Sequence, residues 1–496
     1  MARSLACTLP LTVALVATLA VGACTHEPSP PQIPLRFLSF IVQPSRTAVD
    51  SVIVPAPQVA ILDSLGQTDL TADVAVTIAL FNAQTRTGLT GTTTVTAVSG
   101  IATFNGLRVD HQDTVSFVAS IPNGPVSISS KFRVWPPYVT IAAGNGHSCA
   151  TDAAGATYCW GQNGSGQAAL GPSNIIWATP QEVLMPTAVT FDTVIAGGFH
   201  TCGLTPAGKV YCWGYNLFNQ LGDGTNASQS VPTPVSFPPT ITLVSLTAGY
   251  WHSCALSSSG PAYCWGLNVT GQLGDGTTAT PTTPVIVTTP PGVTFTSISA
   301  GGGHSCALTS TGSAYCWGEN PYGGLGNGTT DSSTTPVQVA SPPGVTFKAV
   351  SAGDEHSCGL TPAGSMYCWG RNDTGQLGDG TADPRLAPVL VNAPGLVFVA
   401  VDADRLRTCA IEAAGALYCW GQNDLIGLLG DGTTIDRRTP VRVLTPAGAV
   451  FNHLSVGPEH TCAISSPEGI AYCWGEGEGL GNGSGLIQMT PVRVAQ

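Results

Sequence analysis

One sequence pattern, HSCATDAAGATYCWG in its first copy at residues 147–161, recurs seven times along the chain. Each copy contains two cysteines ten or eleven positions apart, and successive copies are 51 to 53 residues apart. This periodicity indicates a repeat architecture in which each unit buries its apolar face against the next unit. The cysteine pairs are Cys149 and Cys159, Cys202 and Cys212, Cys254 and Cys264, Cys306 and Cys316, Cys358 and Cys368, Cys409 and Cys419, and Cys462 and Cys473.

Each copy contains four short apolar runs separated by glycine-rich turns, such as residues 293–298, 304–308, 314–317 and 335–339. The runs have the length of strands, and four strands in about 40 to 55 residues are typical of a β-propeller blade. We therefore predict an all-β chain with a seven-bladed β-propeller over residues 139–496. The strand before the first copy could complete the last blade and close the ring, or seven self-contained blades could use the same residues.

The start of the chain resembles an export signal, with a sparse positive charge followed by an apolar stretch over residues 5–21. The sequence VGAC that ends this stretch at Cys24 resembles the lipobox of bacterial lipoproteins, in which the cysteine is lipidated and becomes the mature N-terminus. We predict a signal peptide over residues 1–23, lipidation of Cys24, and anchoring in a bacterial cell envelope outside the cytoplasm. The alternatives are a retained membrane helix and an ordinary signal peptide that precedes a chance cysteine.

Two further segments precede the repeats. Residues 24–34 are rich in proline, which favours extended conformations, so we predict a tether. Residues 35–134 alternate apolar and polar side chains between turn signals, which indicates a β-sandwich. Within it, residues 91–110 resemble the immunoglobulin-like modules of bacterial surface proteins, which implies an immunoglobulin-like fold. This sandwich is interpreted as a spacer, and a specific adhesion face is the alternative.

The composition limits the classes of partner. Charged residues make up 9% of the chain, its net charge is −12, and its lysines are Lys131, Lys209 and Lys348. No basic surface is available to neutralise phosphates, so we expect no nucleic-acid partner. The sequence contains no serine-hydrolase elbow, zinc-protease motif or phosphate-binding loop. We therefore predict no catalytic residues, no metal and no cofactor.

The consensus AGxxHSCALxxxGxxYCWGxNxxGQLGDGT is clearest at residues 300–329 and 352–381. It resembles the repeats of the regulator of chromosome condensation family, and the resemblance covers residues 139–496. It implies the propeller fold strongly and a particular function weakly. Members of that family include a nucleotide exchange factor for a small nuclear GTPase, ubiquitin-ligase accessory domains, a photoreceptor and a secreted bacterial inhibitor of β-lactamases.

The two cysteines of each copy flank a turn, which can place them opposite each other on neighbouring antiparallel strands. We predict that all fourteen form disulfides within their blades, consistent with an oxidising compartment. Metal binding by the histidine and cysteines, and free buried thiols, are the alternatives. Seven equivalent metal sites would be unusual, and the repeats have no close CxxC pair.

Residues that recur in every copy are interpreted as parts of the scaffold. The histidine before Ser/Thr-Cys recurs in six copies, and we expect it to form hydrogen bonds within its own blade. The aspartate of LGDGT could suggest calcium, but it supplies a single carboxylate and becomes Asn327 and Asn482 in two copies, so an Asp-Gly turn is preferred. The tyrosine and tryptophan of YCWG point to one side of their strand, and we expect them to pack blade against blade.

Binding residues should therefore lie where the copies differ, because aromatic and arginine side chains in loops often anchor interfaces. Neutral drift in exposed loops is the alternative. The same loops hold Tyr250, Asp354 and Glu355. The residues predicted to contact a partner are Trp177, Tyr215, Phe218, Trp251, Tyr322, Asp404, Arg405 and Arg407.

These observations predict a monomeric, non-enzymatic binding scaffold that is anchored in the envelope and presents its propeller to an extracellular or envelope protein. A rigid ring that holds variable loops in place reduces the entropy lost on association. The rivals are a soluble inhibitor of a secreted enzyme, guanine-nucleotide exchange as the family resemblance implies, and a lyase or hydrolase that uses a propeller face. The sequence identifies neither the partner nor the face that binds it.

Overall fold

The computed structural model describes most of the chain and confirms that the protein is all-β. The one helical element in the described part is a 3₁₀ turn, η1 (Glu478–Leu480). No helix in this part is long and apolar enough to cross a membrane. The predicted signal peptide, Cys24 and the tether lie outside the described residues. These residues are 36–45, 47–49, 51–81, 88–110, 113–135, 137–171 and 175–495.

The N-terminal part is a β-domain in which a three-stranded sheet, β1-β3-β7, and a larger sheet built on β2-β11-β9-β4-β6 share one apolar core. Strand β10 pairs with β9, and β5 pairs with β8. Strand β4 shows why the chain folds this way: Val76 and Ile78 alternate with more exposed residues and are buried. The strands are β1 (Phe37–Val42), β2 (Thr47–Ala48), β3 (Gln58–Leu62), β4 (Ala75–Phe81), β5 (Leu89–Thr90), β6 (Thr94–Thr96), β7 (Ile101–Thr103), β8 (Arg108–Val109), β9 (Asp113–Ser120), β10 (Val126–Ile128) and β11 (Phe132–Trp135).

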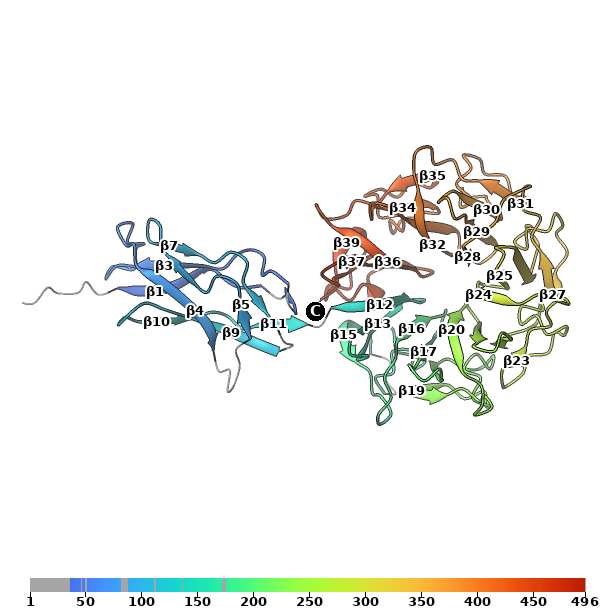
Figure 1. Ribbon diagram of the computed structural model, residues 1–496, viewed down its shortest axis with the longest axis horizontal. Coiled ribbons are helices and arrows are strands. Elements are labelled where there is room, and N and C mark those ends of the chain that lie inside the picture. Colours follow the sequence, from blue (N-terminus) through green and yellow to red (C-terminus); the bar gives the residue numbers. More distant parts are fainter. Residues whose placement is uncertain are drawn as a thin grey trace, which may run out of the picture.

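The rest of the described chain forms seven four-stranded antiparallel sheets, which follow one another around a central axis (Figure 1). We number them sheets 1 to 7 in chain order, and each contains one copy of the repeat. Their strands are β12 (Tyr138–Ala143), β13 (His147–Asp152), β14 (Thr157–Gly161) and β15 (Trp177–Glu182); β16 (Thr193–Ala196), β17 (His200–Leu204), β18 (Val210–Gly214) and β19 (Gln229–Pro234); β20 (Leu243–Ala248), β21 (His252–Ser257), β22 (Ala262–Gly266) and β23 (Val285–Ile286); β24 (Phe295–Ala300), β25 (His304–Thr309), β26 (Ala314–Gly318) and β27 (Ser333–Gln338); β28 (Ala349–Ala352), β29 (His356–Leu360), β30 (Met366–Gly370) and β31 (Arg385–Leu390); β32 (Phe398–Asp404), β33 (Arg407–Glu412), β34 (Leu417–Gly421) and β35 (Arg437–Arg442); β36 (Val450–Val456), β37 (His460–Ser466), β38 (Ala471–Gly475) and β39 (Gln488–Arg493).

Every propeller sheet is built from four consecutive strands, which decides how the ring closes. Strand β12 pairs with β13 as the innermost strand of sheet 1, and sheet 7 contains its own four strands. The N-terminal strand therefore does not complete the last sheet. Sheets 7 and 1 meet instead through side chains: Ser455 Oγ accepts a hydrogen bond from Ala143 N at 2.9 Å, and Trp160 Nε1 donates to Gly479 O at 2.8 Å.

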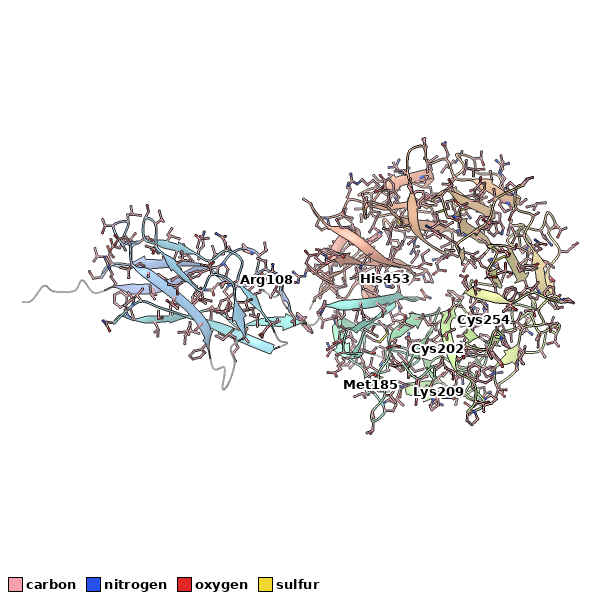
Figure 2. The ribbon with its side chains drawn as sticks, in the orientation of Figure 1. Arg108, Met185, Cys202, Lys209, Cys254 and His453 are labelled. Atoms are coloured by element: carbon pink, nitrogen blue, oxygen red, sulfur yellow. A yellow bond between two sulfur atoms is a disulfide. The ribbon has the colours of Figure 1, made fainter. Side chains whose placement is uncertain are left out.

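The paired cysteines join the second and third strands of each sheet. Cys202 and Cys212 are direct cross-strand partners with Cα atoms 4.1 Å apart, and all seven pairs form disulfides. Cys202 and Cys254 mark the bonds of two neighbouring sheets in Figure 2. The close approach fits a non-hydrogen-bonded position of an antiparallel pair. The predicted disulfides are thus confirmed.

The repeated aromatic side chains pack between neighbouring sheets, as the alternation predicted. Trp213 of sheet 2 lies in one apolar cluster with the Cys149–Cys159 disulfide of sheet 1. Its indole Nε1 donates to Gln167 O of sheet 1 at 2.9 Å. The tryptophan of YCWG is fully buried in all seven sheets. Each disulfide therefore supports the aromatic core of the next interface.

The repeated histidines join sheets, which corrects the expectation that they act within one sheet. His304 Nε2 lies 2.7 Å from Ser357 Oγ of the next sheet, and that hydroxyl donates to Gly324 O at 2.9 Å. In the equivalent contact of His147, Thr201 Oγ1 donates to Gln167 O at 2.9 Å and His147 Nδ1 has no partner among the described residues, so His147 donates from Nε2. The same contact, at 2.6 to 2.9 Å, joins His147 to Thr201, His200 to Ser253, His252 to Ser305, His356 to Thr408 and His460 to Ser148.

The LGDGT segment forms the predicted turn. Asp223 Oδ1 accepts hydrogen bonds from Thr225 N at 2.9 Å and from Thr225 Oγ1 at 2.8 Å, as in an Asx turn. The buried Asn216 amide holds this turn, since its nitrogen donates to Asp223 Oδ1 and to Thr225 O and its oxygen accepts from Leu221 N. This asparagine is present in the consensus, but its role was not recognised from the sequence.

Candidate functional site

One end of the propeller gathers the residues predicted to contact a partner. The strand registers place the loops between first and second strands and the loops between third and fourth strands at the same end, because His200 is paired with Gly214 and Gly214 with Gln229. We call this end the long-loop face. The predicted contact residues all come from these loops or from the strand ends beside them. They are Trp177, Tyr215, Phe218, Trp251, Tyr322, Asp404, Arg405 and Arg407.

Three of these residues form an aromatic cluster with two others. Trp251 is at its centre, with ring centroids 5.8 Å from Tyr215 and 5.1 Å from Phe218. Phe199 and Tyr250 complete the cluster at 5.4 and 4.9 Å from Trp251. All five rings are only partly buried. Three loops of two adjacent sheets thus build a continuous aromatic surface. Ring pairs at these distances stabilise each other.

The other predicted residues lie elsewhere on the long-loop face. Tyr322 is 39% exposed, and the Arg371 guanidinium lies over its ring, 5.1 Å from the centroid. Arg371 also donates to Glu355 at 2.6 Å and to Asp373 at 2.7 Å. Trp177 begins the outermost strand of sheet 1 and does not contact the aromatic cluster.

Arg407 is not available to a partner, which corrects its predicted role. Its side chain is 1% exposed, and its guanidinium donates to three carbonyls of sheet 7, those of Pro458, Gly457 and His460. It therefore replaces the repeated histidine as the link to the next sheet. Burial lowers the pKa of Arg407 to about 10.

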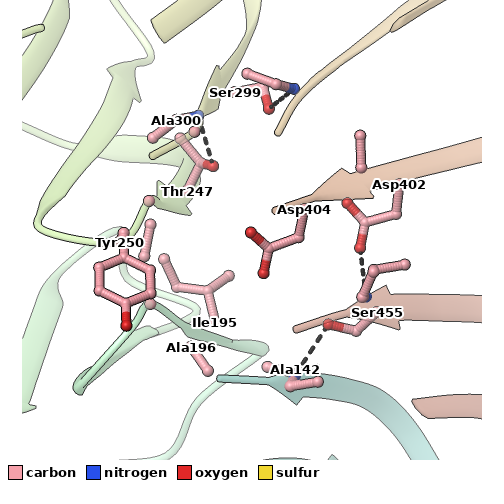
Figure 3. Close-up of a pocket in the computed structure, with 18 of the residues that line it drawn as sticks. Ala142, Ile195, Ala196, Thr247, Tyr250, Ser299, Ala300, Asp402, Asp404 and Ser455 are labelled. Atoms are coloured by element: carbon pink, nitrogen blue, oxygen red, sulfur yellow. Dashed lines mark hydrogen bonds between the residues drawn. The ribbon is translucent and has the colours of Figure 1, made fainter. Parts of the chain in front are cut away.

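Asp404 replaces a glycine at the point where the inner strands crowd around the axis. At the equivalent Gly353, a Cβ atom would collide with the imidazole of His356. An aspartate in sheet 6 therefore requires a different residue in place of the histidine, which is Arg407. Figure 3 shows the Asp404 carboxylate facing the central channel. Burial raises the pKa of Asp404 well above its ordinary value.

The central channel is a cavity of about 320 Å³ that is lined by the innermost strands of the sheets. Its wall is held by hydrogen bonds from backbone amides to side chains of the preceding sheet: Ala300 N donates to Thr247 Oγ1 at 3.2 Å, and Ala352 N to Ser299 Oγ at 3.0 Å (Figure 3). In sheet 6 a carboxylate takes this place, as Asp402 accepts from Val456 N at 2.7 Å. Burial raises the pKa of Asp402 to about 6.

A second cavity, of about 520 Å³, opens at the mouth of this channel on the long-loop face. We call it the mouth pocket. The loop between the first and second strands supplies two residues of each sheet at this mouth. These are Gly302 and Gly303 in sheet 4, Tyr250 and Trp251 in sheet 3, and Asp354 and Glu355 in sheet 5. A Cβ atom on Gly302 would collide with Asp354 Oδ1 and one on Gly303 with Glu319 Oε2, so the two glycines allow these carboxylates to lie against the backbone as an acidic wall, opposite the aromatic wall. Its lining residues are Asn145, Tyr250, Trp251, Leu267, Val269, Thr270, Gln272, Gly302, Gly303, Glu319, Asp354, Glu355, Arg405, Pro458 and Glu459.

A polar network spans the mouth. The Asn145 side chain lies 3.1 Å from Tyr250 Oη, although these residues come from sheets 1 and 3. With its oxygen accepting from Tyr250, the Asn145 amide nitrogen donates to both carboxylate oxygens of Glu459 at 3.0 and 3.1 Å. This network bridges the side of the mouth where Gly198 carries no side chain.

The acidic wall is short of hydrogen-bond donors. Asp354 Oδ1 is buried and accepts no hydrogen bond from the described residues. Burial raises the pKa of Asp354 to about 6. Burial, and then the nearby Glu355, raise the pKa of Glu319, while burial and Glu476 raise that of Glu459. The pocket therefore holds carboxyl groups that lack a full set of cationic partners.

No group of three or more metal-ligating side chains is placed to hold an ion within the described ranges. The described carboxyl groups of the acidic wall are therefore not arranged as the ligands of one metal ion. A hard cation requires several converging oxygen ligands, which the rings of the aromatic wall do not supply.

Comparison with known proteins places the repeats in a family. The "RCC1-like domain" family matches residues 119–403, and the "Regulator of chromosome condensation (RCC1) repeat" family matches residues 414–464. The ultraviolet-B receptor UVR8 of Arabidopsis thaliana is 30% identical over 339 residues, which are 68% of this chain and 76% of the receptor. This chain belongs to the RCC1-like family.

Two further comparisons limit what membership in the RCC1-like family means. The human E3 ubiquitin-protein ligase HERC2 is 32% identical over 350 residues, which are 69% of this chain but 7% of the ligase. The crystal structure of Prp20p from Saccharomyces cerevisiae, reported with its binding to Gsp1p and histones, covers 67% of this chain and 84% of Prp20p. Its TM-score is 0.59 at 23% sequence identity, so it shows a shared fold. RCC1-like propellers thus occur in proteins with different activities.

Five residues of the site were missed by the sequence reasoning: Phe199, which joins the aromatic cluster; Glu319 and Glu459, which line the mouth pocket; and Asn145 and Arg371, which hold its rim. All five stand in columns of the RCC1-like repeat that vary from copy to copy. A comparison of those columns position by position would have found them.

Proposed function

We propose that this protein is a non-enzymatic binding scaffold that presents a seven-bladed, disulfide-bonded propeller to a protein outside the cytoplasm. The observation that carries the proposal is the long-loop face, where residues that differ between copies build the aromatic cluster and the mouth pocket. The repeated residues of each copy are occupied in sheet contacts and turns. A binding surface therefore accounts for the variable residues without altering the scaffold.

The aromatic cluster and the mouth pocket suit a protein partner. Large, partly exposed aromatic side chains are common anchors of protein interfaces. Leu217 extends this surface and is 60% exposed. The disulfides and the contacts between sheets hold these loops in place, so little ordering entropy is lost on association. The reported partners of Prp20p are also proteins, which supports the same class of ligand here.

We propose that the scaffold is exported and anchored in a bacterial envelope through Cys24, with the N-terminal β-domain as an immunoglobulin-like spacer. Seven buried disulfides support an oxidising location. Mass spectrometry of the mature protein tests this proposal. A diacylglyceryl group on Cys24 and fourteen oxidised thiols are expected, while an unprocessed N-terminus with free thiols would contradict it.

Photocrosslinking in the producing cells tests the binding face. A photoreactive amino acid at Leu217 or Tyr322 samples the long-loop face, and one at Ala207 or Ala414 samples the exposed turns of the opposite face. We expect one protein to be captured from both long-loop positions and from neither opposite position. Capture from the opposite face alone would contradict the proposal.

A further inference from the structure

The mouth pocket has one aromatic wall and one acidic wall, and both attract cations. On one side, Tyr250 and Trp251 contribute aromatic rings, and Val269, which is 63% exposed, extends the apolar surface. On the other side are the carboxyl groups of Glu319 and Asp354. Aromatic faces attract cations through their quadrupole, and carboxylates attract them by charge.

The electrostatics of the pocket favour a cation that comes from outside. Four carboxyl groups line it, those of Glu319, Asp354, Glu355 and Glu459, against the single guanidinium of Arg405. Glu355 is paired with Arg371 outside the pocket lining. The buried Asp354 Oδ1 has no donor among the described residues. A cationic ligand that donates N–H groups to the carboxylates on the pocket lining would balance their charge.

The same chemistry is already present beside the pocket, within this chain. The Arg371 guanidinium lies over the Tyr322 ring and donates to carboxylates on both sides, Glu355 and Asp373. A planar guanidinium can stack on a ring with its face while its edges donate hydrogen bonds, which an ammonium group cannot do. The mouth pocket also combines rings with carboxylates, and its four carboxyl groups outnumber its one guanidinium, Arg405.

We propose that the mouth pocket binds the guanidinium of an arginine side chain presented by the protein partner, with the side chain between Trp251 and Asp354. The cavity between these walls provides the space for it, Gly302 and Gly303 allow the Asp354 and Glu319 carboxylates to line it, and Tyr250 completes the aromatic wall. This inference rests on the proposed function, because it names the chemistry by which that partner is recognised.

Calorimetric titration of the mature, oxidised protein tests the proposal with three probes: Nα-acetyl-arginine methylamide, its neutral citrulline analogue and its lysine analogue. We expect the arginine probe to bind with a dissociation constant on the order of 1 mM, and more tightly than either analogue. If the citrulline probe binds as tightly as the arginine probe, the positive charge of the guanidinium does not contribute to binding and the proposal is overturned. Lysine binding of equal or greater strength would overturn the preference for a guanidinium.

Variants identify the pocket. Asp354→Asn and Trp251→Leu should each weaken arginine binding about tenfold, and Trp251→Phe should retain most of it. The matched control Asp331→Asn removes an exposed carboxylate outside the pocket and should leave affinity unchanged. Melting curves of each variant separate lost binding from lost folding, and Asp354→Asn should fold because it removes a buried charge.

The failure of this inference can be distinguished from the failure of the proposed function. If no probe binds the wild-type protein, or if Asp354→Asn binds arginine as well as the wild type, the guanidinium site is overturned. Crosslinking of a protein from Leu217 and Tyr322 would still support the scaffold under either result.

Discussion

The ring of histidines makes the propeller sensitive to acid. Burial lowers the pKa of His147 and His304 to about 4 and that of His200 to about 3, and the other three linking histidines behave alike. In His147 and His200, Nδ1 is buried with no hydrogen-bond partner among the described residues. Protonation would therefore bury a new donor and a charge. The native state binds these protons only below about pH 4, whereas the unfolded state binds them below its ordinary pKa of about 6.5.

The sign and size of the effect follow from that difference. Between pH 7.5 and 5.5 the unfolded state gains protons that the native state does not, so the free energy of unfolding falls as the pH falls. Each linking histidine contributes a loss of about 1.4 kcal/mol over this interval, and six together contribute roughly 8 kcal/mol. The raised pKa values of Asp354, Asp402 and Asp404 act in the opposite direction, because these carboxyl groups take up protons in the native state, and they return part of this loss. The net expected loss is several kcal/mol, a large part of the total stability of many domains.

Urea unfolding followed by tryptophan fluorescence measures this loss, because the seven YCWG tryptophans are buried at the sheet interfaces. Midpoints at pH 7.5, 6.5 and 5.5 should decrease steadily. His252→Gln keeps a side chain that can donate to Ser305 and should reduce the pH dependence by about one sixth. A free energy of unfolding that stays constant between pH 7.5 and 5.5 would refute the assignment of these histidines as buried and neutral.

Three further perturbations test the scaffold. Replacing Cys306 and Cys316 together by alanine should reduce the free energy of unfolding by about 2–3 kcal/mol, since the bond closes a loop of about ten residues; no loss in chemical denaturation would contradict a disulfide there. Asn372→Ala removes donors to Asp379, Thr381 and Asp383 and leaves Leu377 N without its acceptor, so a loss of about 3 kcal/mol is expected by the same measurement. Arg407→His alone should cost about 3 kcal/mol, and Asp404→Gly added to it should recover at least half in a double-mutant cycle, whereas additive losses would show that the two substitutions are independent.

The architecture was predictable because the repeat fixes it several times over. The turn between Cys202 and Cys212 favours adjacent antiparallel strands, and the alternation in YCWG separates the cysteine from its aromatic neighbours. Both are local properties of the sequence, and the same pattern occurs in all seven copies. The direction of the histidine contact was not local: His304 bonds to Ser357, 53 positions away, so reasoning within one copy assigned it wrongly.

The candidate site was only partly predictable for the same reason. Tyr215 and Trp251 could be nominated because they differ from the other copies, but their contact depends on the curvature of the ring, which no single copy contains. The mouth pocket was harder still to predict, since it depends on how the Asp354 and Glu319 carboxylates pack against Gly302 and Gly303. Arg407 was nominated because it differs, yet the difference compensates for Asp404 and serves packing.

The central claim is that binding resides in the variable loops of the long-loop face and folding in the repeated residues. It is tested most directly by replacing two dipeptides of the long-loop face with Gly-Gly, the sequence that sheet 4 has at Gly302 and Gly303. A variant with Gly-Gly in place of Tyr250-Trp251 and of Asp354-Glu355 is compared with a control that has Gly-Gly in place of Pro206-Ala207 on the opposite face. The measurement is the dissociation constant for the protein captured by crosslinking. We predict that the loop variant loses at least a hundredfold in affinity while it still unfolds in a cooperative transition, and that the control binds normally; unchanged binding by the folded loop variant would contradict the account.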